Sequence, residues 1–406
     1  MPAIRSCCVV LALALPAAAQ DVHKVPSEHP TIQEAVDVAA DGDIVEISGG
    51  TYFEAVVVAG KTGLLIRAKG KVVIDPPGAT GLTLDGCTDC VVEKVRVAGG
   101  APYGFHLLDS TGCALVKCRV ESSADDGIRA EGGSGHLIEK CTVEAAGDDA
   151  IALGSGGGAS VDGSLVIKCK LIAPHEDGVF VNGSNNDVES CTAIDAGQAG
   201  FSVTDSASSN DFFDCKAVRP GTSGLFAAGS NNDFLACKVT RSTLAGAYVE
   251  SGNANRIAGC KLVKSGFDGI FAEQATTNVQ ILDNKVVSSA DDNIEVDGPG
   301  ASVTDNICLK ATDDGCRLDG TGGTWSRNTS KGSGGDGFFV AFGTGNTLDD
   351  NTAKGSKGDG FGLGPDSSGN TLTSNVGKGN KGFDLNDESG GANTIGAGND
   401  FGTTSP

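Results

Sequence analysis

Residues 125–153 read DDGIRAEGGSGHLIEKCTVEAAGDDAIAL, and this stretch contains one motif twice. An acidic pair, a small residue and an Ile begin at Asp125, and the same pattern begins again 23 residues later, at Asp148. Self-similarity at a fixed period of about 20–50 residues is typical of solenoids, propellers and other repeat arrays. The stretch therefore predicts a repeat architecture, and the rest of the repeat decides which one.

The repeat extends along most of the chain. A small residue followed by an apolar, a variable and an apolar residue recurs 14 times, at spacings of 22–24 residues apart from one of 28. We call the small residue the anchor; the anchors are Gly81, Gly104, Gly127, Ala150, Gly178, Gly200, Gly224, Gly246, Gly269, Asn293, Gly315, Gly337, Gly360 and Gly382. Because Gly and Asn tolerate a positive φ best, we expect a left-handed backbone at the anchors.

A second column of residues runs in phase with the anchors. It consists of Cys118, Cys141, Cys169, Cys191, Cys215, Cys237 and Cys260, followed by Asn284, Asn306, Asn328, Asn351 and Asn375. Each member lies in a short β-type pattern, and equivalent residues of stacked coils are ~4.8 Å apart. We expect an inward-facing stack in which amides bond one another and thiols pack as small apolar groups, with disulfides between neighbouring coils as the alternative.

These columns predict an all-β fold, a parallel β-helix solenoid of about 14 coils. Helical repeats are excluded because no coil carries a long enough 3.6-residue apolar period. The nine-residue calcium-binding β-roll is excluded because the spacing is 22–24 residues.

The N-terminal segment supports the same fold. Residues 27–58, SEHPTIQEAVDVAADGDIVEISGGTYFEAVVV, resemble the entry of right-handed β-helix proteins of the pectin-lyase-like superfamily. Thr31 and Glu34 form a capping box, which predicts a short helix that closes the end of the solenoid. The resemblance implies an N-terminal cap helix and entry coil at 20–60 and β-helix repeats at 61–406. It does not imply one activity, because this superfold carries lyases, hydrolases, esterases, epimerases and adhesins.

Export is predicted by the first residues, MPAIRSCCVVLALALPAAAQ. Arg5, an apolar stretch too short to span a bilayer, and small residues before a cleavage point near Ala19 indicate a signal peptide at 1–19. We therefore expect a secreted protein, extracellular or periplasmic, that does not insert into membranes. A net charge of −22 argues against nucleic acid as a partner, and we expect a monomer.

Aromatic side chains gather at one outward-facing position. Two residues after successive anchors, side chains point away from the core, and this position holds Phe180, Phe226, Tyr248 and Phe271. Aromatic residues also favour exposed sheet faces and stack there as ladders, so an ordinary ladder is one interpretation. The other is a sugar-binding platform in which His106 and Arg129, at the same position of earlier coils, meet sugar hydroxyl or carboxylate groups.

Acidic residues precede eight of the anchors, Asp126 and Asp149 among them. Side chains at these two positions would lie ~5 Å apart, where like charges repel and either share a proton or bind a cation. Asp before Gly is also an ordinary turn residue, and eight copies exceed what one active site needs. We interpret the series as turn structure, with Asp126 and Asp149 as candidate Ca²⁺ ligands.

The N-terminal part of this series resembles polygalacturonase-type hydrolases. DDGI, then GDDAIALGSG (147–156), then APHEDGVF (173–180) match successive coils of that family. The resemblance implies catalytic roles for Asp126, Asp148 and Asp149, with His175 or Asp177 as a looser match. The family's Asn-Thr-Asp, Gly-His-Gly and Arg-x-Lys motifs are replaced here by ADDG, HEDG and FSV.

The resulting hypothesis is a carbohydrate-active β-helix that binds an extracellular polysaccharide of the polyuronate type. It would cleave the chain by hydrolysis or β-elimination, with catalysis by Asp126, Asp148, Asp149, Asp177 and His175. No cofactor is required, although Ca²⁺ on the acidic pairs would offset repulsion of an anionic sugar. The alternative is a non-catalytic surface, adhesion or carbohydrate-binding scaffold, and the sequence leaves open whether the protein is an enzyme.

Overall fold

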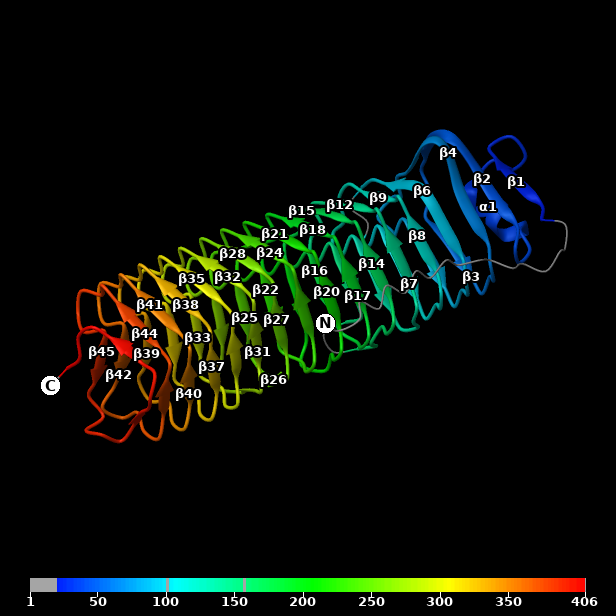
Figure 1. The fold of residues 1–406 in the computed structure, drawn as a ribbon. Coiled ribbons are helices and arrows are strands. Elements are labelled where there is room, and N and C mark those ends of the chain that lie inside the picture. Colours follow the sequence, from blue (N-terminus) through cyan, green and yellow to red (C-terminus); the bar gives the residue numbers. More distant parts are fainter. Residues whose placement is uncertain (1–19, 100–101, 156–157, 406) are drawn as a thin grey trace.

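The chain winds into one long parallel β-solenoid, drawn in Figure 1 from a computed structural model. The structure describes residues 20–99, 102–155 and 158–405, so the predicted signal peptide lies outside the described residues. Strands of neighbouring coils pair in parallel, for example Ile128 with Ile151. The predicted parallel β-helix is confirmed, and the stack has one more coil at its N-terminal end than the anchors indicated.

One face of the solenoid is a sheet of 15 strands, which we call the site sheet. Its strands, in stacking order, are β3 (Val56–Ala59), β5 (Leu82–Asp85), β7 (Phe105–Leu108), β10 (Ile128–Glu131), β13 (Ile151–Leu153), β16 (Val179–Val181), β19 (Phe201–Val203), β22 (Leu225–Ala227), β25 (Ala247–Val249), β29 (Ile270–Ala272), β33 (Ile294–Val296), β36 (Cys316–Leu318), β39 (Phe338–Val340), β42 (Phe361–Leu363) and β45 (Leu385–Asp387). The 13 strands from β5 to β42 each begin directly after a predicted anchor, whereas β3 belongs to the additional coil and β45 begins at Leu385.

The other faces form a sheet of 30 strands that bends at a corner of each coil. It starts with β1 (Val22–Val25), β2 (Ile44–Tyr52), β4 (Leu65–Ile74) and β6 (Val91–Val97), and then divides into two ladders. The first ladder is β8 (Ala114–Val116), β11 (Leu137–Glu139), β14 (Leu165–Ile167), β17 (Asp187–Glu189), β20 (Asp211–Phe213), β23 (Asp233–Leu235), β27 (Arg256–Ala258), β31 (Gln280–Leu282), β34 (Ser302–Thr304), β37 (Thr324–Ser326), β40 (Thr347–Asp349), β43 (Thr371–Thr373) and β46 (Thr394–Ile395). The second is β9 (Arg119–Val120), β12 (Thr142–Glu144), β15 (Lys170–Ile172), β18 (Thr192–Ile194), β21 (Lys216–Val218), β24 (Lys238–Thr240), β28 (Lys261–Val263), β32 (Lys285–Val287), β35 (Ile307–Leu309), β38 (Thr329–Lys331), β41 (Thr352–Lys354), β44 (Val376–Lys378) and β47 (Asp400–Phe401). A small separate sheet pairs β26 (Gly252–Asn253) with β30 (Thr276–Thr277).

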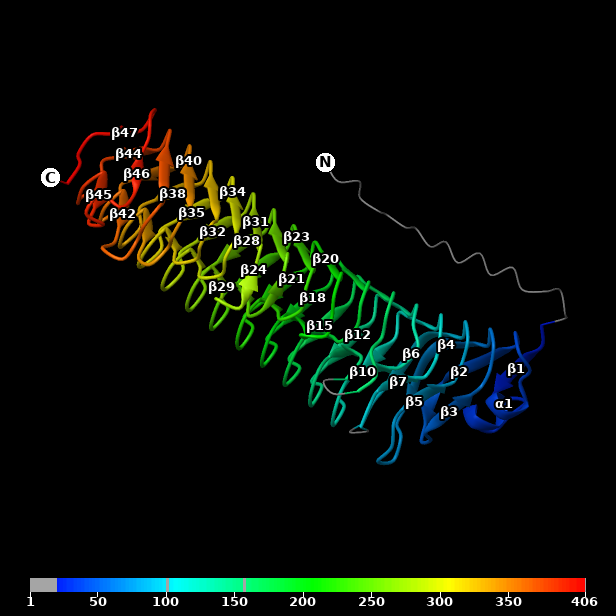
Figure 2. The same ribbon diagram turned by 90° about the horizontal axis from the view of Figure 1, so that it is seen from below.

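Helix α1 (Ile32–Val38) lies at the N-terminal end of the stack, as Figure 2 shows from below. Thr31 Oγ1 accepts a hydrogen bond from Glu34 N at 3.1 Å, which confirms the predicted N-terminal cap. Ile32, Ala35 and Val36 are buried against the first coil, because they face the same side of the helix. Among the described residues, no helix has the length and apolar character needed to cross a bilayer.

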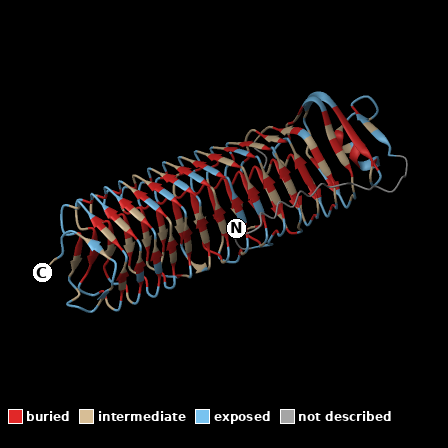
Figure 3. Ribbon diagram, in the orientation of Figure 1, coloured by how far each residue is buried: buried red, intermediate tan, exposed pale blue. Residues whose placement is uncertain are grey.

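The interior of the solenoid is a continuous apolar core. Buried residues line the inside of the coils, whereas the exposed residues lie mainly in the turns between strands (Figure 3). Inside the core, Phe212 meets Phe201 of the same coil edge-on, with ring centroids 6.2 Å apart, and stacks on Phe234 of the next coil, with centroids 4.8 Å apart. In the described part of the chain all 12 cysteines are unpaired and buried, as expected for packing thiols.

The Asn column behaves as predicted. Asn306 Oδ1 accepts hydrogen bonds from the Asn284 backbone N–H at 2.9 Å and from Asn284 Nδ2 at 3.0 Å. Asn306 Nδ2 donates to the Ile281 carbonyl oxygen at 2.8 Å, so every polar group of the side chain is satisfied in the buried corner.

The predicted positive φ at the anchors is wrong. The anchors lack it, and positive φ occurs instead at corner residues such as Lys117 and Lys140. The anchor is small because of close packing: a Cβ at Gly127 would lie 2.2 Å from Val143 Cγ1 of the same coil and 2.7 Å from the Ala150 carbonyl oxygen of the next coil. Asn293 is accommodated because its Oδ1 accepts a hydrogen bond from Ser289 Oγ at 3.0 Å, inside the coil.

The last anchor is also shifted by two residues. Leu385 pairs with Phe361, so the anchor of this coil is Asp384 and the outward residue is Asn386. Glycine repeats around Gly382 hid this register in the sequence. The single 28-residue spacing corresponds to a longer turn between β13 and β14, of which residues 156–157 are not described.

Candidate functional site

The acidic residues before the anchors form a hydrogen-bonded ladder between coils. Asp126 Oδ1 accepts from the Asp149 backbone N–H at 3.1 Å, and Asp149 Oδ1 accepts from the Asp177 backbone N–H at 2.8 Å. The same bond recurs far along the stack, from the Asp314 backbone N–H to Asp292 Oδ1 at 2.6 Å. This ladder gives the series a structural function, and only the second oxygen of each carboxyl group remains for other contacts.

At Asp126 the second oxygen is taken by an arginine. Arg129 Nη1 lies 2.7 Å from Asp126 Oδ2, and the guanidinium also lies over the Tyr103 ring, 5.8 Å from its centroid. Asp126 is completely buried, which raises its pKa to about 6 although the Arg129 charge opposes the shift. Asp126 therefore lies behind Arg129 and holds it in place.

At Asp149 the second oxygen has no such partner among the described residues. The side chain is 6% exposed, and burial together with the charge of Asp177 raises its pKa to about 9. A carboxyl group with this pKa is protonated at neutral pH and can donate a proton. Asp177 differs, because its Oδ1 accepts from the Ala199 backbone N–H at 2.7 Å and its Oδ2 from the Ser202 hydroxyl.

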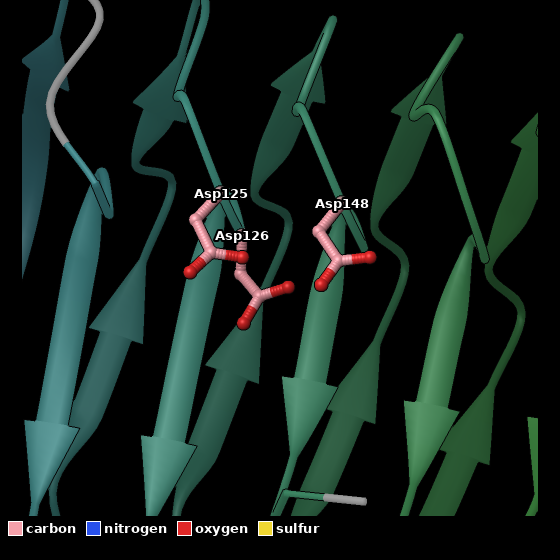
Figure 4. Close-up of side chains that lie close together, drawn as sticks. All are labelled: Asp125, Asp126 and Asp148. Carbon is pink, nitrogen blue, oxygen red and sulfur yellow. The ribbon is translucent and has the colours of Figure 1, made fainter.

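A second acidic row borders the first. Figure 4 shows Asp125 and Asp126 at the start of one strand and Asp148 at the start of the next. One carboxyl oxygen each of Asp148, Asp149 and Glu176 lies within 4.8 Å of the others. Burial and then the neighbouring Glu176 raise the pKa of Asp148.

These groups open into a groove of about 520 Å³ on the site sheet. Its acidic end is lined by Arg129, Asp148, Asp149, Glu176 and Asp177. Phe180 lies beside this end, on the coil of Asp177, and the groove continues past Gln198, Ser202, Thr204, Thr222 and Ser223 to Phe226, Leu244 and Tyr248. The structure thus brings four predicted site residues of the acidic end together with three of the predicted aromatic residues.

The aromatic rings are partly buried by one another rather than fully exposed. Tyr248 stacks on Phe271 with centroids 5.6 Å apart and planes 5° apart, and meets Phe226 edge-on at 5.6 Å. Phe271 lies beyond the residues that line the groove and continues its row of rings.

Three other predicted site residues lie outside the groove. Asp126 is covered by Arg129, and His175 lies exposed in the preceding turn. His106 stacks on Tyr103 at 4.8 Å, and its Nε2 is 3.7 Å from Glu131 Oε2. Burial lowers the pKa of His106, so the ring is neutral near pH 7 and does not supply the positive charge that was expected of it.

Of one column of the site, only Asp148 was predicted from the sequence. Glu176, Gln198, Thr222 and Leu244 each lie two residues before an anchor, and all four line the groove. The same position holds Asp125 and Asp148, so reading this column along the repeat would have found them.

The acidic groups could also hold a cation. Asp148 belongs to two groups of three carboxylates, one with Asp125 and Asp126 and one with Asp149 and Glu176. The predicted Ca²⁺ ligands Asp126 and Asp149 therefore lie in different groups, and Asp126 Oδ2 already faces Arg129. Oxygen ligands at these separations fit Ca²⁺, which remains a prediction at this end of the molecule.

The family model for the right-handed β-helix region matches residues 80–236, 223–376 and 274–402. The chain belongs to this family. The predicted membership of the pectin-lyase-like superfamily is thereby confirmed for this right-handed β-helix protein. A comparison of the sequence with curated proteins finds no match.

Solved structures share the β-helix at low sequence identity. The catalytic unit of a GH87 α-1,3-glucanase from Streptomyces thermodiastaticus is 15% identical with a TM-score of 0.52, covering 96% of this chain and 70% of that one. The A-module of mannuronan C-5 epimerase AlgE6 of Azotobacter vinelandii is 13% identical with a TM-score of 0.40, covering 92% and 94%. The surface adhesin PfbA of Streptococcus pneumoniae is 9% identical with a TM-score of 0.46, covering 87% and 86%. The first of these likenesses supports the fold, and none of them selects an activity.

Proposed function

We propose that this β-helix is a polysaccharide hydrolase whose groove holds a glycan chain along the solenoid axis. The observation that carries the proposal is that one groove is lined both by Asp149, with a pKa of about 9, and by a row of aromatic rings. A glycoside hydrolase needs a carboxylic acid that keeps its proton at neutral pH beside a second carboxyl group.

In the proposed reaction, Asp149 gives its proton to the glycosidic oxygen as the bond to the anomeric carbon breaks. Asp148 and Glu176, at the rim, stabilise the positive charge that develops on the sugar ring. Their oxygens lie within 4.8 Å of an oxygen of Asp149. This spacing is nearer to the ~5–5.5 Å of retaining glycosidases than to the ~6.5–9.5 Å of inverting ones. Water then completes the hydrolysis and returns the proton to Asp149.

The remaining polar residues position these groups. Asp126 fixes Arg129 through the 2.7 Å ion pair, and Arg129 faces the groove with 15% of its side chain exposed. We assign Arg129 the role of orienting sugar hydroxyl groups. Asp177 supports Asp149 through its backbone N–H.

Hydrolysis fits the charges of the groove better than β-elimination does. Elimination from a uronate needs a cation to neutralise the sugar carboxylate, and Arg129 is already paired with Asp126. Four carboxyl groups and one guanidinium line the acidic end. A neutral glycan therefore fits the groove without help, whereas a polyuronate would need Ca²⁺ bound to the rim carboxylates.

We also place the protein outside the cytoplasm, as a monomer. The support is the signal-peptide pattern of residues 1–19, since a polysaccharide substrate would be encountered there.

A non-catalytic binding protein is the second candidate. The stacked rings of Phe226, Tyr248 and Phe271 favour it, because a row of rings along the solenoid axis binds sugars without any chemistry. On this alternative the acidic ladder only stabilises the stack.

The test is a panel of neutral and uronate polysaccharides incubated with the purified protein, with Ca²⁺ or with a chelator. New reducing ends without ultraviolet absorbance are expected, on neutral glycans and without Ca²⁺. Ultraviolet absorbance from unsaturated uronates would show that the protein cleaves its substrate by β-elimination and not by hydrolysis. Binding of a glycan with no cleavage on a broad panel would contradict the proposal in favour of the binding protein.

A further inference from the structure

A second set of carboxylates lies on the site sheet beyond the aromatic rings. One carboxyl oxygen each of Asp268, Asp291 and Asp292 lies within 4.8 Å of the others. Asp268 and Asp292 precede β29 and β33 on neighbouring coils, and none of the three lines the groove. This set, which we call the distal cluster, has no role in the proposed hydrolysis.

The distal cluster contains a buried oxygen without a partner. Asp268 is completely buried, and its Oδ1 accepts from the Asp292 backbone N–H at 3.0 Å. Its Oδ2 is also buried and has no hydrogen-bond donor among the described residues, and the neighbouring Glu295 carboxyl group adds a second negative charge beside it. A buried carboxylate oxygen left in this state is costly unless a proton or a cation meets it.

Nearby basic residues do not supply that cation. In two of the other acidic sets an arginine forms ion pairs: Arg129 with Asp126 at 2.7 Å, and Arg317 with Asp319 at 2.9 Å and with Glu295 at 3.3 Å. Within the described ranges, no Lys, Arg or His forms an ion pair with a residue of the distal cluster. Asp148, Asp149 and Glu176 likewise form no ion pair within the described residues, but unlike the distal cluster their set contains no buried oxygen without a hydrogen-bond partner.

The geometry matches that of a divalent cation site. Two oxygens that each lie ~2.3–2.6 Å from Ca²⁺ are at most ~5 Å apart, and Ca²⁺ takes 6–8 oxygen ligands with water filling the remainder. Asp291 is partly exposed, so a cation can enter from solvent and keep water on that side. The backbone hydrogen bond of Asp268 fixes one ligand before the cation arrives.

We propose that Asp268, Asp291 and Asp292 bind one Ca²⁺ ion, which links two neighbouring coils at the end of the aromatic row. Asp268 Oδ2 is the innermost ligand, and Asp291 closes the site toward solvent. The site is independent of the hydrolysis proposed above, because it shares no residue with the groove.

The test is calorimetric titration of Ca²⁺ into protein that has been stripped of cations with a chelator. Asp268→Asn keeps an oxygen for the Asp292 backbone N–H and removes the charge, so the variant is expected to fold. Asp148→Asn is the matched control, because Asp148 is the residue common to both N-terminal acidic groups. We expect the wild type and Asp148→Asn to bind Ca²⁺ at the distal cluster, and Asp268→Asn to lose this binding by more than about tenfold. Ca²⁺ should also raise the melting temperature of the wild type and not that of Asp268→Asn.

Three results would overturn the proposal. Wild-type protein that binds no Ca²⁺ at millimolar concentration would exclude the site. Loss of Ca²⁺ binding in Asp148→Asn alone would show that the cation binds at the N-terminal acidic groups instead. Equal binding by all three proteins would indicate an adventitious surface ion. If Asp268→Asn fails to fold, Asp291→Asn replaces it, because the Asp291 side chain is partly exposed and makes no ladder bond.

Discussion

A single carboxyl group at Asp149 serves two purposes through its two oxygens. Oδ1 accepts the Asp177 backbone N–H at 2.8 Å, as in every coil of the acidic ladder, and Oδ2 is left for the groove. Asp314 makes the same ladder bond to the Asp336 backbone N–H at 2.6 Å and lies outside the groove. Whether an aspartate of the ladder is structural or reactive therefore depends on whether its second oxygen faces the groove.

The raised pKa of Asp149 predicts the upper limit of the pH–rate profile. Hydrolysis requires the protonated acid, so kcat/KM should fall about tenfold per pH unit above a pKa of about 9. Carbon-13 NMR titration of the aspartate carboxyl groups, with Asp149→Asn to assign the resonance, measures the same pKa independently. A titration midpoint near 4 for Asp149 would show that it is ionised at neutral pH and would remove it as the acid.

Residue-scale sequence reasoning found Asp148, Asp149 and Asp177 because they stand at fixed offsets from anchors. It could not separate Asp126 from Asp149, because the two occupy equivalent positions and only Arg129, folded over Asp126, distinguishes them. It also overlooked Glu176, whose position two residues before the anchor holds Leu244 in another coil.

Successive strands of the site sheet place aromatic residues in a row. Tyr248 in β25 has a ring on either side, from Phe226 in β22 and Phe271 in β29. The row arises because equivalent residues of adjacent coils are one strand spacing apart, ~4.8 Å, which also lets partly buried rings support one another.

The row of aromatic rings in the groove predicts that glycan binding weakens when one of these rings is removed. Tyr248→Ala should weaken oligosaccharide binding by about 0.5–1.5 kcal/mol, or roughly 2–12-fold in Kd, because a ring that faces a sugar is removed. Phe339→Ala is the control, since Phe339 occupies the equivalent outward position in β39, beyond the groove, and lies over Arg317. Calorimetry with a bound oligosaccharide measures both, and equal losses would contradict a binding role for the groove.

The buried Asn column predicts a difference in stability. Asn306→Ala leaves the Asn284 backbone N–H and Nδ2 without an acceptor, which should lower the free energy of unfolding by about 1–3 kcal/mol. Asn306→Cys should cost less, because a thiol occupies this column in earlier coils and Cys191 Sγ accepts the Cys169 backbone N–H at 3.4 Å. Urea denaturation of both variants checks the order, and a Cys variant no better than the Ala variant would refute it.

At the scale of elements, the repeat predicted where strands begin but not why anchors are small. The reason is close packing in three dimensions, since a Cβ at Gly127 would meet Val143 Cγ1 at 2.2 Å and the Ala150 carbonyl oxygen at 2.7 Å, and a one-dimensional pattern does not contain these contacts. In the same way, the register at Leu385 is set by pairing with Phe361, whereas the glycines around Gly382 fit two alignments.

The protein as a whole is strongly acidic, with a net charge of −22, and many of its carboxyl groups are buried along one face. Burial is the first cause that raises the pKa of Asp149 and Asp292 to about 9 and of Asp268 to about 8. Such groups favour the folded state while they keep their protons and oppose it once they ionise.

Stability should therefore fall as the pH rises from about 5 to about 9. The folded-state pKa values of Asp149 and Asp292 lie above the ordinary value near 4, so their contribution is complete below pH 4 and lost as the pH passes about 9. In chelator, the melting temperature should drop by several degrees across this range, and less steeply in Asp149→Asn/Asp292→Asn. A melting temperature that rises with pH would contradict the assignment of these carboxyl groups as protonated.

The architecture as a whole was accessible from the sequence, because a period of 22–24 residues with two columns in phase leaves few alternatives. The groove could be predicted from the sequence only in part. Its depth depends on side chains from four columns meeting on one face, and on small residues such as Ala199 and Ser223 between the acidic and aromatic ends.

The most direct test of the account compares polysaccharide hydrolysis by the wild type, Asp149→Asn and Asp314→Asn on the best substrate of the panel. Both substitutions keep an oxygen for the ladder hydrogen bond, so the melting temperatures of the two variants should match. The variants should differ only in hydrolytic activity, because Asp149 lines the groove and Asp314 does not. We expect a loss of about 10²–10⁴-fold in rate for Asp149→Asn and wild-type activity for Asp314→Asn. Equal activity of the two variants would contradict it.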